Sequence, residues 1–356
     1  MRGRVNLMAE YRQWREQNRA QLHDVVPLDT PYNVEIEVSS LCNARCIYCA
    51  HSTDHGLYEG NMTEELFYKI LCDLKAFPHK VKKCNLFGFG ESLMHPKFPE
   101  MVKETKAADV AEAVEFTTNG MLLTTEKIDA ILDAGIDTIR ISLQGINEET
   151  YQKICGVHLD FHRFINNLTY LFQNRGGCRV RMKIADTAIK DIPDGEERFK
   201  KLFGPIADSI YIEHILPIYA GVDYDGIDKG ICRDTRNGRM GIQQDAVHKV
   251  CHRPFYRLRI CTDGRVTAMC CDATRDVLFG KIQDETLLDI WNGKRRTNFL
   301  KMQLEGKRFA HPWCKDCAMP NDIASEADIL DPWAADILKR IQEFEKRGND
   351  TELSPS

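Results

Sequence analysis

The sequence contains no apolar run that approaches the ~20 residues a helix needs to cross a membrane. Its N-terminus, "MRGRVNLMAEYRQWREQ", starts with basic residues but lacks the apolar segment of a signal peptide. Short-period repeats and low-complexity stretches are also missing. These absences predict a cytoplasmic globular protein with no membrane partner.

The chain also lacks a large excess of charge of either sign. Lys and Arg number 48 against 53 Asp and Glu, a net charge of −5, so we expect no nucleic-acid partner. The most basic stretches are "HRPFYRLRI" (252–260) and "NGKRRTNF" (292–299). Because neither extends into a block of like charges, we expect both to be solvated faces.

Cysteine, in contrast, is plentiful. The 14 cysteines are not expected to form disulfides in a reducing cytosol, where clustered cysteines indicate metal ligands or catalysts. Two clusters stand out, one near residue 45 and one in the C-terminal third. The cysteines outside them are predicted to be small buried hydrophobes: Cys72, Cys84, Cys155, Cys178 and Cys232.

Strand-like and helix-like segments alternate from residue 31, which predicts βα units and a parallel sheet. The segment 124–135 is a clear helix, with Thr124 or Thr125 as its N-cap and Gly135 as its C-terminal cap. Six strands are predicted, at 32–38, 83–90, 113–120, 137–145, 178–186 and 209–219.

Outside this alternation we expect a polar helix over 8–24, a hairpin turning at Asp263-Gly264, one helix over 284–306 and a disordered tail from 346. Glycine-rich residues 220–250 indicate a linker or a loop over a site. The predicted divisions are an N-terminal helical extension, an α/β domain, that linker or active-site loop, a smaller α+β domain, and a C-terminal helix with its tail. Their boundaries are 1–30, 31–220, 221–250, 251–325 and 326–356.

The first cysteine cluster holds three thiols, Cys42, Cys46 and Cys49, in "SSLCNARCIYCAHS" (39–52). A closed zinc site takes four ligands, and His51 and His55 are near enough to keep zinc open as an alternative. A four-iron cluster held by three cysteines leaves one iron free for a substrate or cofactor, which gives a reason for three ligands.

This C-x3-C-x2-C loop after a first strand resembles the signature of radical S-adenosylmethionine enzymes. The resemblance implies a partial (β/α)6 TIM-like barrel, a [4Fe-4S] cluster with an open iron, and S-adenosyl-L-methionine as a cofactor. It places Tyr48 against the adenine. In "FGFGES" (87–92), Gly90 and Glu91 match the family's Gly-Gly-Glu turn, which receives the methionine ammonium group, while Phe89 and Ser92 depart from it.

Polar residues end the third and fourth strands, where ligands collect in parallel sheets. The resemblance places Asn119 near the same cofactor and Ser142 near its ribose, with Gln144 beside Ser142. The family's fifth-strand motif is not visible, so Lys183 has no assigned role. His214 is expected to be a core or rim histidine.

The second cluster lies in "CHRPFYRLRICTDGRVTAMCCD" (251–272) and "HPWCKDC" (311–317). With "GKIQDETLLDIWN" (280–292), it resembles the SPASM domain in its shortened "twitch" form. The resemblance implies one auxiliary [4Fe-4S] cluster, with Cys271 as an alternative to Cys270. A zinc ribbon is the competing interpretation. The four implied ligands are Cys251, Cys270, Cys314 and Cys317.

The resemblance implies an oxidoreductase or epimerase. An electron donor such as flavodoxin or ferredoxin would allow S-adenosylmethionine to be cleaved to a 5′-deoxyadenosyl radical, which abstracts hydrogen from a substrate. Cys261 and Cys271 are candidate hydrogen donors for an epimerisation. Because only about thirty residues precede the first strand, we expect a small, carbohydrate-like substrate rather than a peptide recognised by a fused domain.

Four alternatives to this interpretation stay open. A peptide- or protein-modifying radical enzyme is the main alternative, since recognition could come from a separate protein, and an activase of glycyl-radical enzymes is a further one. A non-catalytic zinc protein would require a fourth ligand at the first cluster. An electron-carrying iron–sulfur protein would require four ligands on every cluster and no cofactor turn at 87–92.

Overall fold

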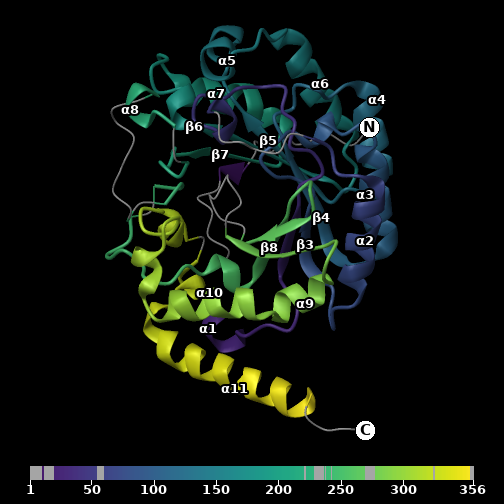
Figure 1. The fold of residues 1–356 in the computed structure, drawn as a ribbon. Coiled ribbons are helices and arrows are strands. Elements are labelled where there is room, and N and C mark those ends of the chain that lie inside the picture. Colours follow the sequence, from purple (N-terminus) through teal and green to yellow (C-terminus); the bar gives the residue numbers. More distant parts are fainter. Residues whose placement is uncertain are drawn as a thin grey trace.

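The computed structural model describes residues 10–11, 20–53, 60–219, 222–227, 236, 238–241, 243–268, 277–323 and 325–352. Its centre is one curved sheet with the strand order β1-β7-β6-β5-β4-β3-β2-β8-β9-β10. Helices cover the outer face of this sheet, and α9, α10 and α11 lie together at one end (Figure 1). The sheet does not close into a full barrel.

The six predicted strands are confirmed as β2 to β7, and each pairs in parallel with the next in chain order. This is the order expected when every connection crosses over through helix. The structure therefore has the predicted partial (β/α)6 barrel. The strands are β2 (Asn33–Ile36), β3 (Val81–Asn85), β4 (Ala111–Thr118), β5 (Thr138–Leu143), β6 (Arg179–Ala185) and β7 (Ser209–Glu213).

Local sequence signals explain where these helices begin and end. Thr124 caps α4 by accepting a hydrogen bond from the Lys127 N–H, and Gly135 follows its C-terminus at φ +87°, a conformation that favours glycine. The helices among these strands are α2 (Glu64–Lys75), α3 (Phe98–Ala108), α4 (Thr125–Asp133), α5 (Glu148–Cys155), α6 (Phe161–Asn174), α7 (Gly195–Phe203) and, after β7, α8 (Tyr224–Ile227).

The segment after residue 250 continues the same sheet. Strand β8 (Arg257–Ile260) pairs in parallel with β2, and β9 (Arg265–Thr267) and β10 (Leu278–Lys281) follow as antiparallel strands. The predicted turn at Asp263-Gly264 is confirmed, with Gly264 at φ +81°. One apolar core runs from the barrel strands to Trp291 without a break.

The predicted single helix over 284–306 is wrong. Gly293 ends α9 (Leu287–Asn292) and precedes the first residue of α10 (Lys294–Leu304), because its extended backbone at ψ 153° interrupts the helix. Trp291, in the last turn of α9, is fully buried, and its ring nitrogen donates to the Leu28 carbonyl.

The termini also differ from the prediction. Within the predicted helix over 8–24, Glu10–Tyr11 form strand β1 and helix α1 covers Leu22–Val25, while 8–9 and 12–19 lie outside the described residues. A free edge of β7 was available for pairing, which overrides a weak local helix preference. Helix α11 (Ala334–Glu352) confirms the C-terminal helix but extends into the segment expected to be disordered; residues 353–356 lie outside the described residues.

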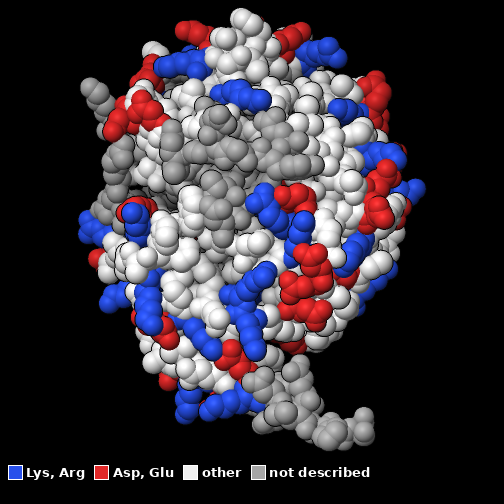
Figure 2. Space-filling view, in the orientation of Figure 1, with Lys and Arg blue, Asp and Glu red and all other residues white. Residues whose placement is uncertain are grey.

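Helices α1, α10 and α11 enclose a second, smaller apolar core. On the face shown in Figure 2, acidic and basic side chains are mixed, and neither sign forms one large patch. In the described part of the chain, no helix is long and apolar enough to cross a membrane.

Candidate functional site

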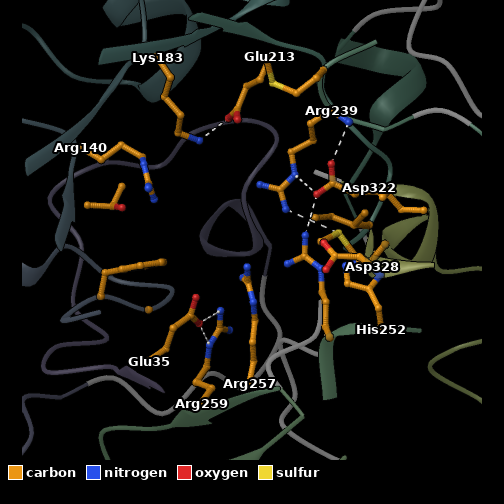
Figure 3. Close-up of a pocket in the computed structure, with 18 of the residues that line it drawn as sticks. Glu35, Arg140, Lys183, Glu213, Arg239, His252, Arg257, Arg259, Asp322 and Asp328 are labelled. Carbon is orange, nitrogen blue, oxygen red and sulfur yellow. Dashed lines mark hydrogen bonds and ion pairs between the residues drawn. The ribbon is translucent and has the colours of Figure 1, made fainter. Parts of the chain in front are cut away.

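The inner face of the sheet carries polar side chains, and these side chains line the site. Along β5 and β6 the apolar Ile139, Ile141, Val180 and Met182 are fully buried. The alternate residues Arg140 and Lys183 line a cavity on the other face of the strands. A barrel interior is usually filled by branched apolar side chains; here it holds a cavity of about 330 Å³ (Figure 3).

The first cysteine loop follows β2 and is fixed by backbone hydrogen bonds at its start and at its middle. At its start, the Ser40 N–H donates to the Gly60 carbonyl at 2.9 Å. At its middle, the Arg45 N–H donates to the Cys155 carbonyl at 3.1 Å and the Ile47 N–H to the Ile154 carbonyl at 2.9 Å. The end of α5 therefore holds the loop, a support that the sequence motif did not indicate.

The three cysteines of this loop fit an iron–sulfur cluster. Cys42, Cys46 and Cys49 are half-buried and in no disulfide. Burial raises the pKa of the Cys42 thiol to about 11, and the neighbouring Glu91 and Cys49 add to the rise. Thiolates here need positive charge beside them, which iron supplies.

The spacing of these thiols also bears on the fit. Among the described residues, no three His, Cys, Asp or Glu side chains lie close enough together to hold one metal ion. A four-iron cube binds each cysteine to a different iron, so its ligands need not converge on one point.

The turn after β3 packs directly against the start of this loop. A Cβ atom added at Gly90 would lie 2.4 Å from the Ser39 carbonyl oxygen and 2.6 Å from that of Leu41, so no side chain fits there. The Glu91 N–H donates to the Leu41 carbonyl at 2.8 Å. The glycine predicted from the family turn is thus required by the close approach of two backbones.

Glu91 is buried and already bonded. Its carboxylate accepts hydrogen bonds from the Thr118 hydroxyl (2.7 Å) and from the N–H groups of Asn119 (2.7 Å) and Leu93 (3.1 Å). Burial raises the pKa of Glu91 despite these donors. An ionised carboxylate has about four acceptor positions, so roughly one is left for a cofactor ammonium group.

The other predicted cofactor residues contact the cysteine loop or belong to it. The Asn119 side chain donates to Asn43 of the cysteine loop at 2.8 Å. The Tyr48 hydroxyl donates to Gln144, whose side chain also donates to the Ser142 carbonyl at 3.1 Å. The structure thus brings the predicted residues of the strand ends to the cysteine loop.

The second cysteine set surrounds a small cavity of about 30 Å³ lined by Cys251, Cys314 and Cys317. Burial raises the pKa of Cys251 to about 11 and of Cys314 to about 12, and another cysteine of the set adds to each rise. Ala268, the last described residue before Cys270, lines the same cavity. Such an all-thiol set fits an iron–sulfur cluster.

Two buried side chains that the sequence analysis did not single out support this set. Gln303 accepts a hydrogen bond from the Cys251 N–H at 3.2 Å and contacts the Cys314 sulfur at 3.7 Å. Arg308 donates to the Cys314 carbonyl at 2.6 Å and to that of Cys317 at 3.3 Å. A Gln and an Arg in a polar helical stretch carry no local signal of burial.

The remaining cysteines give a mixed outcome. Cys84, Cys155 and Cys178 are buried as predicted, whereas Cys72 is exposed, so its predicted burial is wrong. Cys261 is fully buried and is not among the described residues that line the large cavity. Cys232, Cys270 and Cys271 lie outside the described residues.

The prediction of a solvated face is wrong for 252–260, whereas in 292–299 Lys294 and Arg295 are exposed as predicted and only Arg296 is buried. Arg253, Arg257 and Arg259 line the large cavity, and Arg296 is buried over the Trp291 ring at 3.2 Å. In β8 the arginines alternate with the buried Leu258 and Ile260, so they face inward, as alternation in a strand requires.

Lys183 and His214 also find partners at the ends of β6 and β7. Lys183 forms an ion pair with Glu213, and both side chains are largely buried. His214 is half exposed, so it is not a core histidine, and its Nδ1 lies 2.7 Å from Asp186. That hydrogen bond raises the pKa of His214 against the opposing effect of burial.

Comparisons with known proteins match both cysteine regions. Residues 36–186 match the family model of the radical SAM superfamily, and residues 251–318 match that of the iron–sulfur cluster-binding domain called SPASM. Over 340 residues the chain is 26% identical to the "Tungsten-containing aldehyde ferredoxin oxidoreductase cofactor-modifying protein" of Pyrococcus furiosus. The alignment covers 84% of this chain and 90% of that protein.

Two solved structures share the fold. BtrN in complex with AdoMet and 2-DOIA is 20% identical with a TM-score of 0.50, and the match covers 82% of this chain and 94% of that chain. Streptococcus suis SuiB bound to precursor peptide SuiA is 14% identical with a TM-score of 0.57, over 76% of this chain and 66% of that chain.

Proposed function

Because this chain belongs to the radical SAM superfamily and carries a C-terminal iron–sulfur cluster-binding domain, we propose that it abstracts hydrogen from a C–H bond of a small, carbohydrate-like molecule held in the large cavity. One observation carries the proposal. In the turn after β3, Gly88 and Phe89 line the cavity, and the next residue, Gly90, packs against the cysteine loop. The cofactor loops and the cavity thus share one turn.

The cofactors of this enzyme are S-adenosylmethionine with a [4Fe-4S] cluster and auxiliary iron–sulfur. When bound, they supply a 5′-deoxyadenosyl radical that removes a hydrogen atom from the substrate. We assign Cys42, Cys46 and Cys49 to the first cluster, with one iron open to S-adenosylmethionine. The residues that we assign to S-adenosylmethionine are Tyr48, Gly90, Glu91, Asn119, Ser142 and Gln144.

In this assignment the protein's part is to position and to shield. Glu91 ties the cofactor turn to the end of β4 through Thr118 and Asn119, which fixes the turn relative to the cysteine loop. Phe89 and Tyr219 contact each other at 5.9 Å between ring centres and both line the cavity. These rings belong to the apolar part of a wall that also carries many charged side chains, and they help to exclude water there.

The outcome we propose is dehydrogenation or epimerisation. Dehydrogenation requires the substrate radical to lose a proton and an electron, which the auxiliary cluster would accept, whereas epimerisation requires a thiol to return a hydrogen atom. Since Cys261 is buried away from the cavity lining, Cys271 is our candidate for that thiol. An electron donor such as flavodoxin or ferredoxin is the proposed partner.

Two findings support a small-molecule substrate. The Pyrococcus furiosus relative, whose alignment covers 84% of this chain, is named as a protein that modifies a cofactor. The cavity volume of about 330 Å³ also lies at the lower end of the range for small-ligand sites. Modification of a peptide is the alternative; SuiB, bound to its precursor peptide, shares the fold.

The proposed function predicts that the reduced, reconstituted enzyme forms 5′-deoxyadenosine from S-adenosylmethionine, and that a substrate raises the rate above the background. Candidate sugars and peptides are compared by liquid chromatography of the nucleoside. In deuterated water, deuterium incorporation into the product distinguishes epimerisation from dehydrogenation. Absence of any 5′-deoxyadenosine from an enzyme with full iron content would contradict the proposal.

We assign the auxiliary cluster to Cys251, Cys270, Cys314 and Cys317. Replacing Cys314 and Cys317 together by alanine is expected to lower the iron content from about eight to about four atoms per chain, because one of two four-iron clusters is lost. Anaerobic reconstitution followed by iron, sulfide and zinc analysis measures this. A Cys72→Ala variant, which changes an exposed thiol, is the control. Zinc in place of iron would overturn the assignment.

A further inference from the structure

The large cavity is unusually rich in cationic side chains for a chain of net charge −5. Its lining contains six of them: Arg140, Lys183, Arg239, Arg253, Arg257 and Arg259. Four acidic side chains line it as well, so the formal excess is two positive charges. Cations gathered in a concave, partly buried space attract an anion far more strongly than the same charges on an open surface.

Most of these cations are held by acidic partners. A carboxylate oxygen of Glu35 lies 2.8 Å from both the Nε and an Nη of Arg259. Asp322 lies 2.8 Å from Arg253 and 3.3 Å from Arg239. Burial alone would raise the pKa of Asp322, but the two arginines outweigh it and hold the pKa below its usual value.

Arg257 is different. It extends from the start of β8 into the cavity beside the Glu35–Arg259 pair (Figure 3). Its guanidinium lies 4.9 Å from the Tyr256 ring centre. In the part of the chain that the structure describes, no ion pair joins Arg257 to a carboxylate, and its buried Nε, like those of Arg140 and Arg253, has no hydrogen-bond acceptor.

A buried guanidinium donor without an acceptor costs free energy, because it has lost water and gained nothing in return. Such a group is expected to gain its partner from a ligand. The rigid fork of a guanidinium matches the paired oxygens of a phosphate, and the stacking on Tyr256 orients it.

We propose that the substrate is a phosphate ester and that Arg257 binds its phosphate group. The inference rests on the proposed function, since it identifies the substrate class of that same cavity. A phosphate monoester carries a charge near −2 at neutral pH, which matches the excess of two positive charges in the lining. A single carboxylate, such as one peptide side chain provides, would neutralise only half of that excess.

The test measures binding of inorganic pyrophosphate to the reconstituted enzyme by anaerobic calorimetry. We expect wild-type enzyme to bind it and Arg257→Gln to bind it at least about tenfold more weakly, the usual effect of losing a charged hydrogen bond. Arg257→Lys keeps the charge without the fork and is expected to lie between the two. Arg198→Gln, which changes an exposed arginine of α7, is the matched control and should bind like wild type.

Several results would overturn the inference: no binding by wild type, equal binding by Arg257→Gln, or an equal loss in Arg198→Gln. Succinate tests for a dicarboxylate in place of a phosphate, and binding as tight as pyrophosphate would exclude a site specific for phosphate. If Arg257→Gln does not fold by circular dichroism, the lysine variant decides, and wild-type affinity in it overturns the inference.

The parallel assay for 5′-deoxyadenosine separates this inference from the proposed function. An enzyme that forms the nucleoside but does not bind pyrophosphate contradicts only the phosphate site. An enzyme that binds pyrophosphate through Arg257 but never forms the nucleoside contradicts only the radical function.

Discussion

Replacing Cys46 by alanine is expected to lower 5′-deoxyadenosine formation by more than about 100-fold, beyond the loss typical of residues that only orient metal ligands. Iron is expected to fall by about four atoms per chain, since two thiolates do not hold the cube. Chromatography of the nucleoside and iron analysis of the same preparation measure both effects.

Cys155 provides the matched control because its thiol contacts that of Cys46, yet it belongs to the core. Its sulfur lies 3.0 Å from the Tyr151 carbonyl oxygen. Cys155→Ala is expected to cost only about 1 kcal/mol of stability and to keep iron and activity. If this variant loses the cluster and Cys46→Ala retains it, our assignment of the ligands is wrong.

Gly90→Ala is expected to reduce S-adenosylmethionine cleavage by about 100-fold, the scale associated with a 1 Å misplacement of reacting groups. The added methyl group would meet the backbone of Ser39 and Leu41 at 2.4 to 2.6 Å, so the cofactor turn and the cysteine loop must move apart. The rate of 5′-deoxyadenosine formation and the affinity for S-adenosylmethionine, measured by equilibrium dialysis, report the change.

Gly177→Ala is the comparison, because an added Cβ there has no heavy atom within 4 Å. It should leave both quantities unchanged, which shows that the loss of a glycine is not itself harmful. A wild-type rate in Gly90→Ala would mean that the contact between the two loops does not position the cofactor.

Much of the fold could be predicted because its signals are local. The Thr124 cap, the Gly135 terminus and the alternation of strands and helices each depend on neighbouring residues, and the structure reproduces them. The cysteine loop could be predicted for the same reason, since its three thiols lie within eight positions of the sequence. The hydrogen bonds that hold that loop could not be predicted, because their acceptors at the end of α5 lie over a hundred positions away in the chain.

The cavity was missed for a related reason. "NVEIEV", "TIRISL" and "RVRMKI" alternate apolar with polar residues, although the strands of a parallel sheet are usually apolar on both faces. That alternation is the sequence signal of a charged interior. It becomes informative only together with the pairing of β8 and β2, which turns Arg257 and Arg259 toward the cavity instead of toward solvent.

Two segments of the chain build different parts of the site. The segment before residue 145 supplies the cysteine loop and most of the strand ends around it, whereas the cavity wall that carries Arg253, Arg257 and Arg259 comes from the segment after residue 250. Yet β8 is a strand of the same sheet and shares its core, so neither segment is a detachable module. For protein engineering, exchanging the later segment between relatives therefore requires preserving its edge-to-edge match with β2. A chimera that respects this match can acquire a different cavity wall while its cysteine loop stays intact.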